Sequence, residues 1–349
     1  MRSCLLVTAL VSSLAGTALC FSGSTLPNQR TTSLSSSSVS VSSVVKDDDV
    51  QLELTEKGLL KRDRYVATNR FAVRAGKEAK FEARWANRQS RLATLDGFRY
   101  FHLMRRVTLN DDGSGINTYQ PGEAKEEKMG NYVSFTIWER KSDFSAWRTG
   151  DAFKEAHGGT SIGAFMSTMI NSALVLKGPP RPAFYDGLLM QSVPPTSIPE
   201  TENGWRTNLV ADGVTNLPAE CFVACNQFFV PTENGPAFEK RWADRESKLA
   251  ECEGFVAFGM MRRDGTAKGH GTSPMGMDEP TYMSTTIWSD RAAFESWKNG
   301  NAFRQSHGTN KDDDAAKEKK PAAPAPLWSK PPSPIFYEGT LVITKEEGP

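Results

Sequence analysis

The chain has 349 residues, enough for two domains of the usual size of about 100–200 residues each. Hydrophobic residues make up 38% of it and charged residues 24%, which is typical of a globular protein with apolar cores. The 42 basic and 41 acidic residues leave a formal net charge of +1, which argues against a nucleic-acid partner. Five cysteines without a CxxC motif argue against a disulfide framework and against a structural zinc site. No apolar run approaches the roughly 18 residues of a membrane span, so we expect none in the mature protein.

The N-terminal 45 residues have the composition of a targeting sequence. Residues 1–20 carry one early basic residue, then an apolar stretch, and end in small residues at the positions that precede a signal-peptide cleavage site. Residues 21–45 hold ten Ser and three Thr and no acidic residue, which is typical of a transit peptide. A signal peptide joined to a transit peptide, with Phe21 at the junction, resembles the two-part presequences of algae with secondary plastids. We therefore expect a plastid protein, with secretion followed by a Ser-rich linker as the alternative.

An internal repeat sets the organisation of the remaining chain. Residues 81–98 align with residues 238–255 at 11 of 18 positions, and residues 136–158 align with residues 286–308 at 10 of 23. This period is far longer than the roughly 20–50 residues of solenoid repeats, so it indicates a duplicated domain. The expected divisions are a first domain over 64–190, a polar, Pro-containing linker over 191–220 and a second domain over 221–345.

Both copies predict the same order of elements. With the second copy in parentheses, we expect a first strand at 65–74 (221–230), followed by an amphipathic helix through Phe81, Trp85 and Leu92 (Phe238, Trp242 and Leu249) that ends at Gly97 (Gly254). Two strands should follow, at 98–107 (255–263) and at 132–139 (282–289). The copy should then finish with a helical region at 142–157 (292–307), broken at Gly150 (Gly300), and a last strand at 183–189 (335–343). The order βαββαβ is typical of an α+β ferredoxin-like module, a four-stranded antiparallel sheet with both helices on one face. Two such modules can pack their bare sheet faces together, and we expect one pseudo-dimeric α/β barrel.

Three residue types recur at matched positions in the two copies. They are Asn69 and Asn226 in the first strand, Trp147 and Trp297 in the second helical region, and His157 and His307 ten residues beyond each Trp. Singly, each has an ordinary explanation: an amide bonded to backbone, a core Trp, or a His favoured by a helix dipole. Together they suit an iron porphyrin, because imidazole is the usual proximal ligand of haem iron. An Asn N–H can then bond iron-bound oxygen, and a Trp can distort the macrocycle.

The motifs around these residues carry a resemblance to a known family. Thr-Asn-Arg-Phe at 68–71, Phe-Ser-Ala-Trp at 144–147 and Phe-Lys-Glu-Ala-His at 153–157 are repeated in part at 226–228, 294–297 and 303–307. This set resembles the IsdG-type haem-degrading monooxygenases of the antibiotic biosynthesis monooxygenase superfamily, over both copies.

The resemblance implies roles for the six residues and a reaction. His157 and His307 would ligate haem iron, Asn69 and Asn226 would contact bound oxygen, and Trp147 and Trp297 would ruffle the porphyrin. Haem would be both cofactor and substrate of a monooxygenase that opens the ring with O2 and an external electron donor and releases iron. Because the chain has no GxGxxG or flavin fingerprint, the electrons would come from a separate reductase or a small-molecule reductant.

Departures from the family pattern keep other interpretations open. Gln227 stands where the pattern has Arg, and the segments after the two His residues differ, being largely apolar at 158–180 and charged at 308–334. The alternatives are a haem-free monooxygenase of a phenolic or quinol substrate, and a non-catalytic haem-binding module. The sequence also leaves open whether the chain closes its own barrel or forms a homodimer. The arginine pairs at 105–106 and 262–263 are expected at a rim, and His102 and His270, which have no counterpart in the other copy, receive no role.

Overall fold

The computed structural model describes the chain in part. The described ranges are 53–86, 91–110, 116–118, 130–156, 170–192, 209–211, 215–217, 221–245, 247–265, 279–303 and 326–344. The chain divides into two units, Met1–Leu54 and Thr55–Pro349, and every element below belongs to the second. The expected signal and transit peptides lie outside the described residues.

Each copy folds as a βαββαβ module. The first comprises β1 (Arg64–Phe71), α2 (Glu78–Ala86), β2 (Phe98–Leu109), β4 (Tyr132–Trp138), α3 (Lys141–Thr149), α4 (Asp151–Ala156) and β5 (Arg181–Ser192). The second comprises β8 (Phe222–Phe228), α6 (Gly235–Ala243), β9 (Phe255–Arg263), β10 (Tyr282–Trp288), α7 (Arg291–Asn299) and β11 (Ser333–Thr344). The short β3 (Ile116–Thr118) extends the sheet beside β2, and β6 (Leu209–Ala211) pairs with β7 (Thr215–Leu217) as a hairpin within the expected linker.

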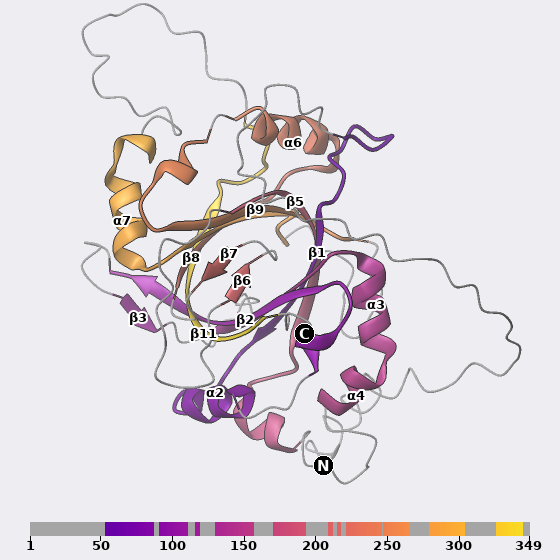
Figure 1. The fold of residues 1–349 in the computed structure, drawn as a ribbon. Coiled ribbons are helices and arrows are strands. Elements are labelled where there is room, and N and C mark those ends of the chain that lie inside the picture. The colour runs from indigo at the N-terminus through magenta and orange to yellow at the C-terminus, as the bar shows by residue number, and fades with distance from the viewer. Residues whose placement is uncertain are drawn as a thin grey trace, which may run out of the picture. The chain divides into compact units, whose positions relative to one another are not determined.

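The two modules close one antiparallel eight-stranded barrel (Figure 1). Its strands follow the order β11-β8-β10-β9-β5-β1-β4-β2, and β11 also pairs with β2, which completes the ring. At both seams, the last strand of one module pairs with the second strand of the other, β5 with β9 and β11 with β2. The expected α+β barrel is therefore built within one chain.

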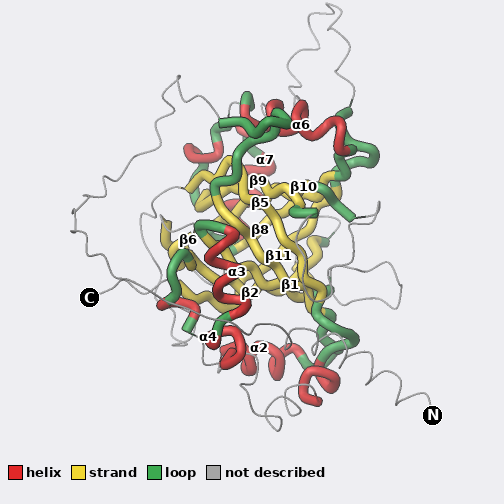
Figure 2. The backbone as a smooth tube through the Cα atoms, turned by 90° about the vertical axis from the view of Figure 1, so that its right-hand side faces the viewer, coloured by secondary structure: helices red, strands yellow, loops and turns green. Residues whose placement is uncertain are grey.

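The two faces of the strands bury different cores. A cluster inside the barrel draws residues from all eight strands, and Val66, Phe135, Val223 and Ile287 are among them. The outer faces bury separate aromatic clusters, one beneath the helices of the first module and two in the second module. Figure 2 shows the strands gathered in the centre, with α6 and α2 at opposite ends of the view. Within the described residues, no helix is long and apolar enough to cross a membrane.

The expected first helix is shorter than the hydrophobic spacing suggested. α2 ends at Ala86, and Leu92 lies in a separate 3-10 turn, Leu92–Thr94. Leu92 nevertheless packs in the same cluster as Phe81, so the spacing predicted the packing but not the helix. In the second module, Leu249 likewise lies in a 3-10 turn, Leu249–Glu251, after α6 has ended. The breaks expected at Gly150 and Gly300 are present, because α3 ends at Thr149 and α7 at Asn299.

Candidate functional site

Both site asparagines face the helix layer and not the barrel interior. On β1, the neighbours of Asn69 at alternate positions, Ala67 and Phe71, belong to the outer cluster, whereas Val66 belongs to the inner one. Side chains alternate between the faces of a strand, so Asn69 points outward. On β8, the same alternation turns Asn226 outward beside Ala224 and Phe228. Asn69 is half-buried and Asn226 is exposed.

The register gives each asparagine the same two neighbours. Asn69 lies opposite Ser134 of β4 and Pro182 of β5. Asn226 lies opposite Ser284 of β10 and Pro334 of β11. Residues directly opposite in an antiparallel pair share a face, so each module presents an Asn-Ser pair to its helices. Sequence analysis did not single out the serines, because only the strand register places them beside the asparagines.

These polar pairs contrast with the threonines beside them. Two residues further along the same faces, Thr136 Oγ1 donates to the Ala67 carbonyl at 3.1 Å, and Thr286 Oγ1 donates to the Ala224 carbonyl at 3.1 Å. Ser134 and Ser284 are only 4% and 6% exposed, yet within the described residues neither serine nor either asparagine has a side-chain hydrogen bond. Neither serine Oγ is among the fully buried side-chain atoms of the described residues that lack a hydrogen-bond partner. The amide and hydroxyl groups of each pair are therefore available to a polar group at this face.

The site tryptophans pack at one end of the same faces. The Trp147 ring lies 5.5 Å from that of Trp138 and 5.0 Å from that of Phe153. The Trp297 ring lies 5.3 Å from that of Trp288 and 4.9 Å from that of Phe303. Both site tryptophans remain half-buried, so each has one side fixed by aromatic packing and part of its ring accessible.

In the first module, Asn69 and Trp147 lie on the same outer face of the sheet but at some distance from each other. Trp138, against which Trp147 packs, pairs with Tyr65 at the far end of β1. Asn69 lies four residues beyond Tyr65, roughly 13 Å along the strand at about 3.3 Å per residue. A ligand that touched both would have to be broad. His157 and His307 lie outside the described residues, although α4 ends at Ala156, immediately before His157.

The two faces differ at the Tyr65 end. Tyr65 donates a hydrogen bond to Asp264 of the other module at 3.1 Å, and Lys141 at the start of α3 forms an ion pair with the same carboxylate. Burial, together with the Asp264 charge and hydrogen bond, raises the pKa of Tyr65 far above its usual value. Phe222 occupies the matching place in the second module and packs against Phe294. Among the described residues, this polar link therefore belongs to the first face alone.

Two of the four arginines expected at a rim, Arg105 and Arg262, form ion pairs that join the modules. Arg262 contacts Glu239 of α6 at 2.8 Å and Asp186 of β5 at 3.0 Å. At the other seam, Arg105 contacts Glu82 of α2 at 3.6 Å and Glu338 of β11 at 3.4 Å. Each arginine therefore links the first helix of its own module to the last strand of the other.

A cavity lined by described residues lies inside the barrel, on the face opposite the asparagines. His102 lines it and is 1% exposed, and its Nε2 lies 3.8 Å from Cys221 Sγ. Alternation along β2, where His102 shares a face with Met104, was the signal that could have placed it there. Within the described ranges, no three His, Cys, Asp or Glu residues gather as a metal site.

The chain is similar in sequence to several known proteins. A family profile described as antibiotic biosynthesis monooxygenase matches residues 64–159 and 221–309, more than half of the chain. A heme oxygenase (mycobilin-producing) of Mycobacterium tuberculosis is 33% identical over 81 residues, which cover 23% of this chain and 66%, just under two thirds, of that protein. A heme oxygenase (staphylobilin-producing) of Staphylococcus saprophyticus is 34% identical over 97 residues, 28% of this chain and 76% of that one. One of Staphylococcus haemolyticus is 28% identical over 113 residues, 32% and 91% of the two chains. A solved structure from Fusobacterium nucleatum overlays with a TM-score of 0.46 at 9% identity, covering 82% of this chain and 96% of that one.

Proposed function

The chain belongs to the antibiotic biosynthesis monooxygenase family, and from this premise we propose that it is a haem-degrading monooxygenase. Haem is its substrate, which it opens with O2 and electrons from an external donor, releasing iron. The similar heme oxygenases of Mycobacterium and Staphylococcus support this choice of substrate.

One observation carries the proposal. Each module presents an Asn-Ser pair without a described hydrogen-bond partner, on the face whose other end holds a half-buried Trp. The pair offers an amide and a hydroxyl to an oxygen-containing group, while the Trp offers an aromatic surface to a flat apolar one. A porphyrin with an oxygen ligand presents both.

Each of the repeated His, Asn and Trp residues has its own proposed role in binding haem. His157 and His307 would hold the iron as neutral imidazoles. Asn69 and Asn226 would donate an amide N–H to the oxygen side, with the Ser134 and Ser284 hydroxyls beside them. Trp147 and Trp297 would press on the ring and fix its orientation. The haem supplies the redox chemistry, and the electrons come from a separate reductase or a small-molecule reductant.

Haemin titration of the full chain, followed by ascorbate in air, tests the proposal. We expect a saturable Soret band that decays after ascorbate, with iron captured by a ferrous chelator and no protection by catalase. His157→Ala and His307→Ala should each remove one of two haem equivalents, and His270→Ala should remove none. A stable Soret band would instead indicate a non-catalytic haem-binding module, and no band would favour the haem-free monooxygenase.

We also propose that the protein works in a plastid, on the composition of residues 1–45. A fluorescent protein fused behind these residues should enter the plastid of an alga with secondary plastids. Export of the fusion from the cell would contradict the proposal.

A further inference from the structure

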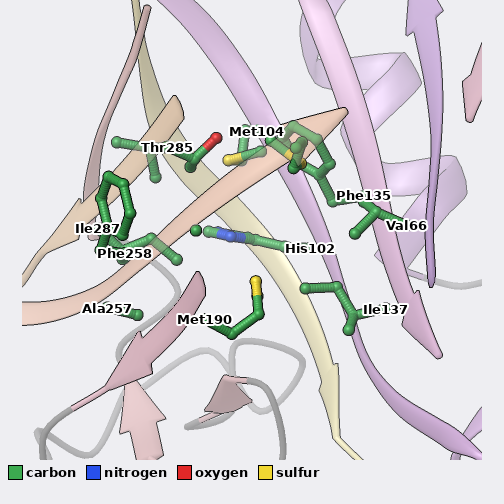
Figure 3. A pocket seen from close by; sticks show the side chains of 13 residues that line it. Val66, His102, Met104, Phe135, Ile137, Met190, Ala257, Phe258, Thr285 and Ile287 are labelled. Atoms are coloured by element: carbon green, nitrogen blue, oxygen red, sulfur yellow. The ribbon is translucent and has the colours of Figure 1, made fainter. Parts of the chain in front are cut away.

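The barrel interior contains a cavity of about 40 Å³ between the two modules (Figure 3). Both modules line it, and several lining residues are repeat equivalents, Val66 with Val223, Met104 with Met261, and Ile137 with Ile287. The imidazole of His102 reaches into it between Met104 and Met190. Because strand faces alternate, this space is separated by the barrel wall from the face that carries Asn69 and Asn226.

The two copies differ in side-chain size at two positions that line the cavity. The first copy contributes His102 and Phe135, and the second contributes Gly259 and Thr285 at the equivalent positions. Both differences remove side-chain volume from the second side. Protein interiors are normally close-packed, and the larger side chain of the first copy at position 285 would occupy part of this space.

An irregularity in β5 turns a further side chain into the same space. The pairing of β5 with β9 shifts between Leu188 and Gln191, and Leu189 has a φ of +50°. Within the described residues, Leu189 is the one residue with a side chain in this left-handed region. Leu188 and Leu189 both pack on the outer side, and Met190 turns inward as a result. Bulges and strained residues of this kind cluster at functional sites.

Gly259 makes room for this arrangement. A Cβ at Gly259 would lie 2.8 Å from Met190 Sδ, closer than side chains pack. The glycine thus allows Met190 to lie across β9 at the edge of the cavity. Met190 and Thr285 are half-buried, whereas the other lining residues on the inner strand faces are buried, so the cavity approaches the surface beside these two. Phe258 is also half-buried, but its ring stacks on Trp242 of the outer face.

We propose that this cavity is a second binding site, for an uncharged, largely apolar molecule of the size of dioxygen. Its volume is about three times that of the roughly 10–15 Å³ that one water-sized guest requires. No charged Asp, Glu, Lys or Arg lines it, and its aliphatic walls carry one imidazole and one hydroxyl as polar groups. Apolar cavities of this kind stay dry and accept apolar guests, and methionine side chains adapt to their shape. The proposal is independent of haem binding at the outer faces.

Xenon is the probe, with the full chain labelled at its methionine methyl groups for NMR. We expect saturable shifts at the methyl groups of Met104, Met190 and Met261 under xenon pressure. Met260, which is buried on the outer face, should not respond. Thr285→Phe, which gives the second copy the residue of the first, should abolish the shifts, whereas Thr285→Val should retain them.

The xenon experiment has results that support the site and results that overturn it. Saturable shifts that Thr285→Phe removes support the site. Absent shifts in the unaltered protein, equal shifts at Met260, or shifts that persist in a folded Thr285→Phe protein overturn it. If Thr285→Phe does not fold, Gly259→Ala replaces it, because the added methyl group pushes Met190 towards the cavity, and weakened xenon shifts are then expected. Unchanged shifts in that variant would count against the site.

Discussion

Among individual residues, the contrast between Ser134 and Thr136 separates structural hydroxyls from available ones. The two lie on one face of β4, but only Thr136 donates to a carbonyl, that of Ala67. The second module repeats the contrast at Ser284 and Thr286. A hydroxyl that bonds the backbone of a neighbouring strand supports the sheet. A hydroxyl that has no described partner, such as that of Ser134, keeps its donor and acceptor available to a ligand.

Removing the two hydroxyls should therefore affect different properties. Thr136→Val should lower the free energy of unfolding by about 1 kcal/mol, because it removes a buried hydrogen bond. Ser134→Ala should leave the free energy of unfolding unchanged or raise it slightly, and should weaken haemin binding by the first module. Urea unfolding and haemin titration measure the two effects. Equal destabilisation by both variants would show that Ser134 supports the fold.

Alternation predicted which residues share a face with Asn69 and Asn226. It did not predict that this face is the outer one, because residues on both faces of β1 and β8 are buried. The serines beside them were not predictable, since their position depends on a register that joins residues 65 positions apart in the first module. The partners of Arg105 and Arg262 were beyond sequence reasoning for the same reason. Each arginine meets a carboxylate on the last strand of the other module, which depends on how the barrel closes. His102 was overlooked because it lacks a repeat equivalent.

Among the elements, the turn at Gly97 is the clearest case of local sequence controlling structure. Gly97 has a φ of +69°, and a Cβ there would lie within 2.1 Å of Asp143 Oδ2 at the start of α3. The turn thus needs both a left-handed backbone and close approach to a helix. Gly76 has nearly the same φ, +73°, but nothing lies within 4 Å of its would-be Cβ.

The two glycines make a matched pair for mutation. Gly76→Ala should lower the free energy of unfolding by about 1–2 kcal/mol, the cost of a left-handed residue with a side chain. Gly97→Ala should cost more, because α3 must also shift. Denaturant unfolding compares the two variants. If both variants lose the same free energy of unfolding, the close contact between position 97 and Asp143 does not contribute to stability.

The order of strands and helices could be read from hydrophobic periodicity and turn residues. The end of the first helix could not. Leu92 falls seven residues after Trp85, which fits two helical turns, and it packs where a helix would have placed it. A 3-10 turn before Gly97 brings Leu92 to the same cluster by another path.

At the scale of the whole molecule, buried tyrosines link the fold to pH. Burial is the main cause that raises the pKa of Tyr65, Tyr132, Tyr282 and Tyr337 far above the usual value of 10.0. Carboxylates next to the first three add to the rise. Each stays protonated in the folded protein at pH values where it ionises in the unfolded chain. Their contribution to stability is complete below pH 10 and is lost as the pH rises above it.

Stability should therefore fall steeply in alkali. Four such tyrosines predict a loss of about 5 kcal/mol per pH unit above pH 10, at about 1.4 kcal/mol each. Tyr337→Phe should reduce this slope by about one quarter, since one ionising group is removed. Urea unfolding between pH 8 and pH 11 measures the slope. A slope that is the same in both proteins would contradict the assignment for Tyr337.

The seam between β11 and β2 has a consequence for the order of events during folding. Residues 336–344 pair with residues 100–107, which precede them by more than 220 positions. Contacts of such separation form slowly, because a long loop must close first. Until the last strand emerges, the free edge of β2 remains an available template for another chain. A chain stopped before Ser333 should therefore be prone to aggregate. By pairing with β2, the final strand β11 removes the free edge of the first module and so protects it from pairing with another chain.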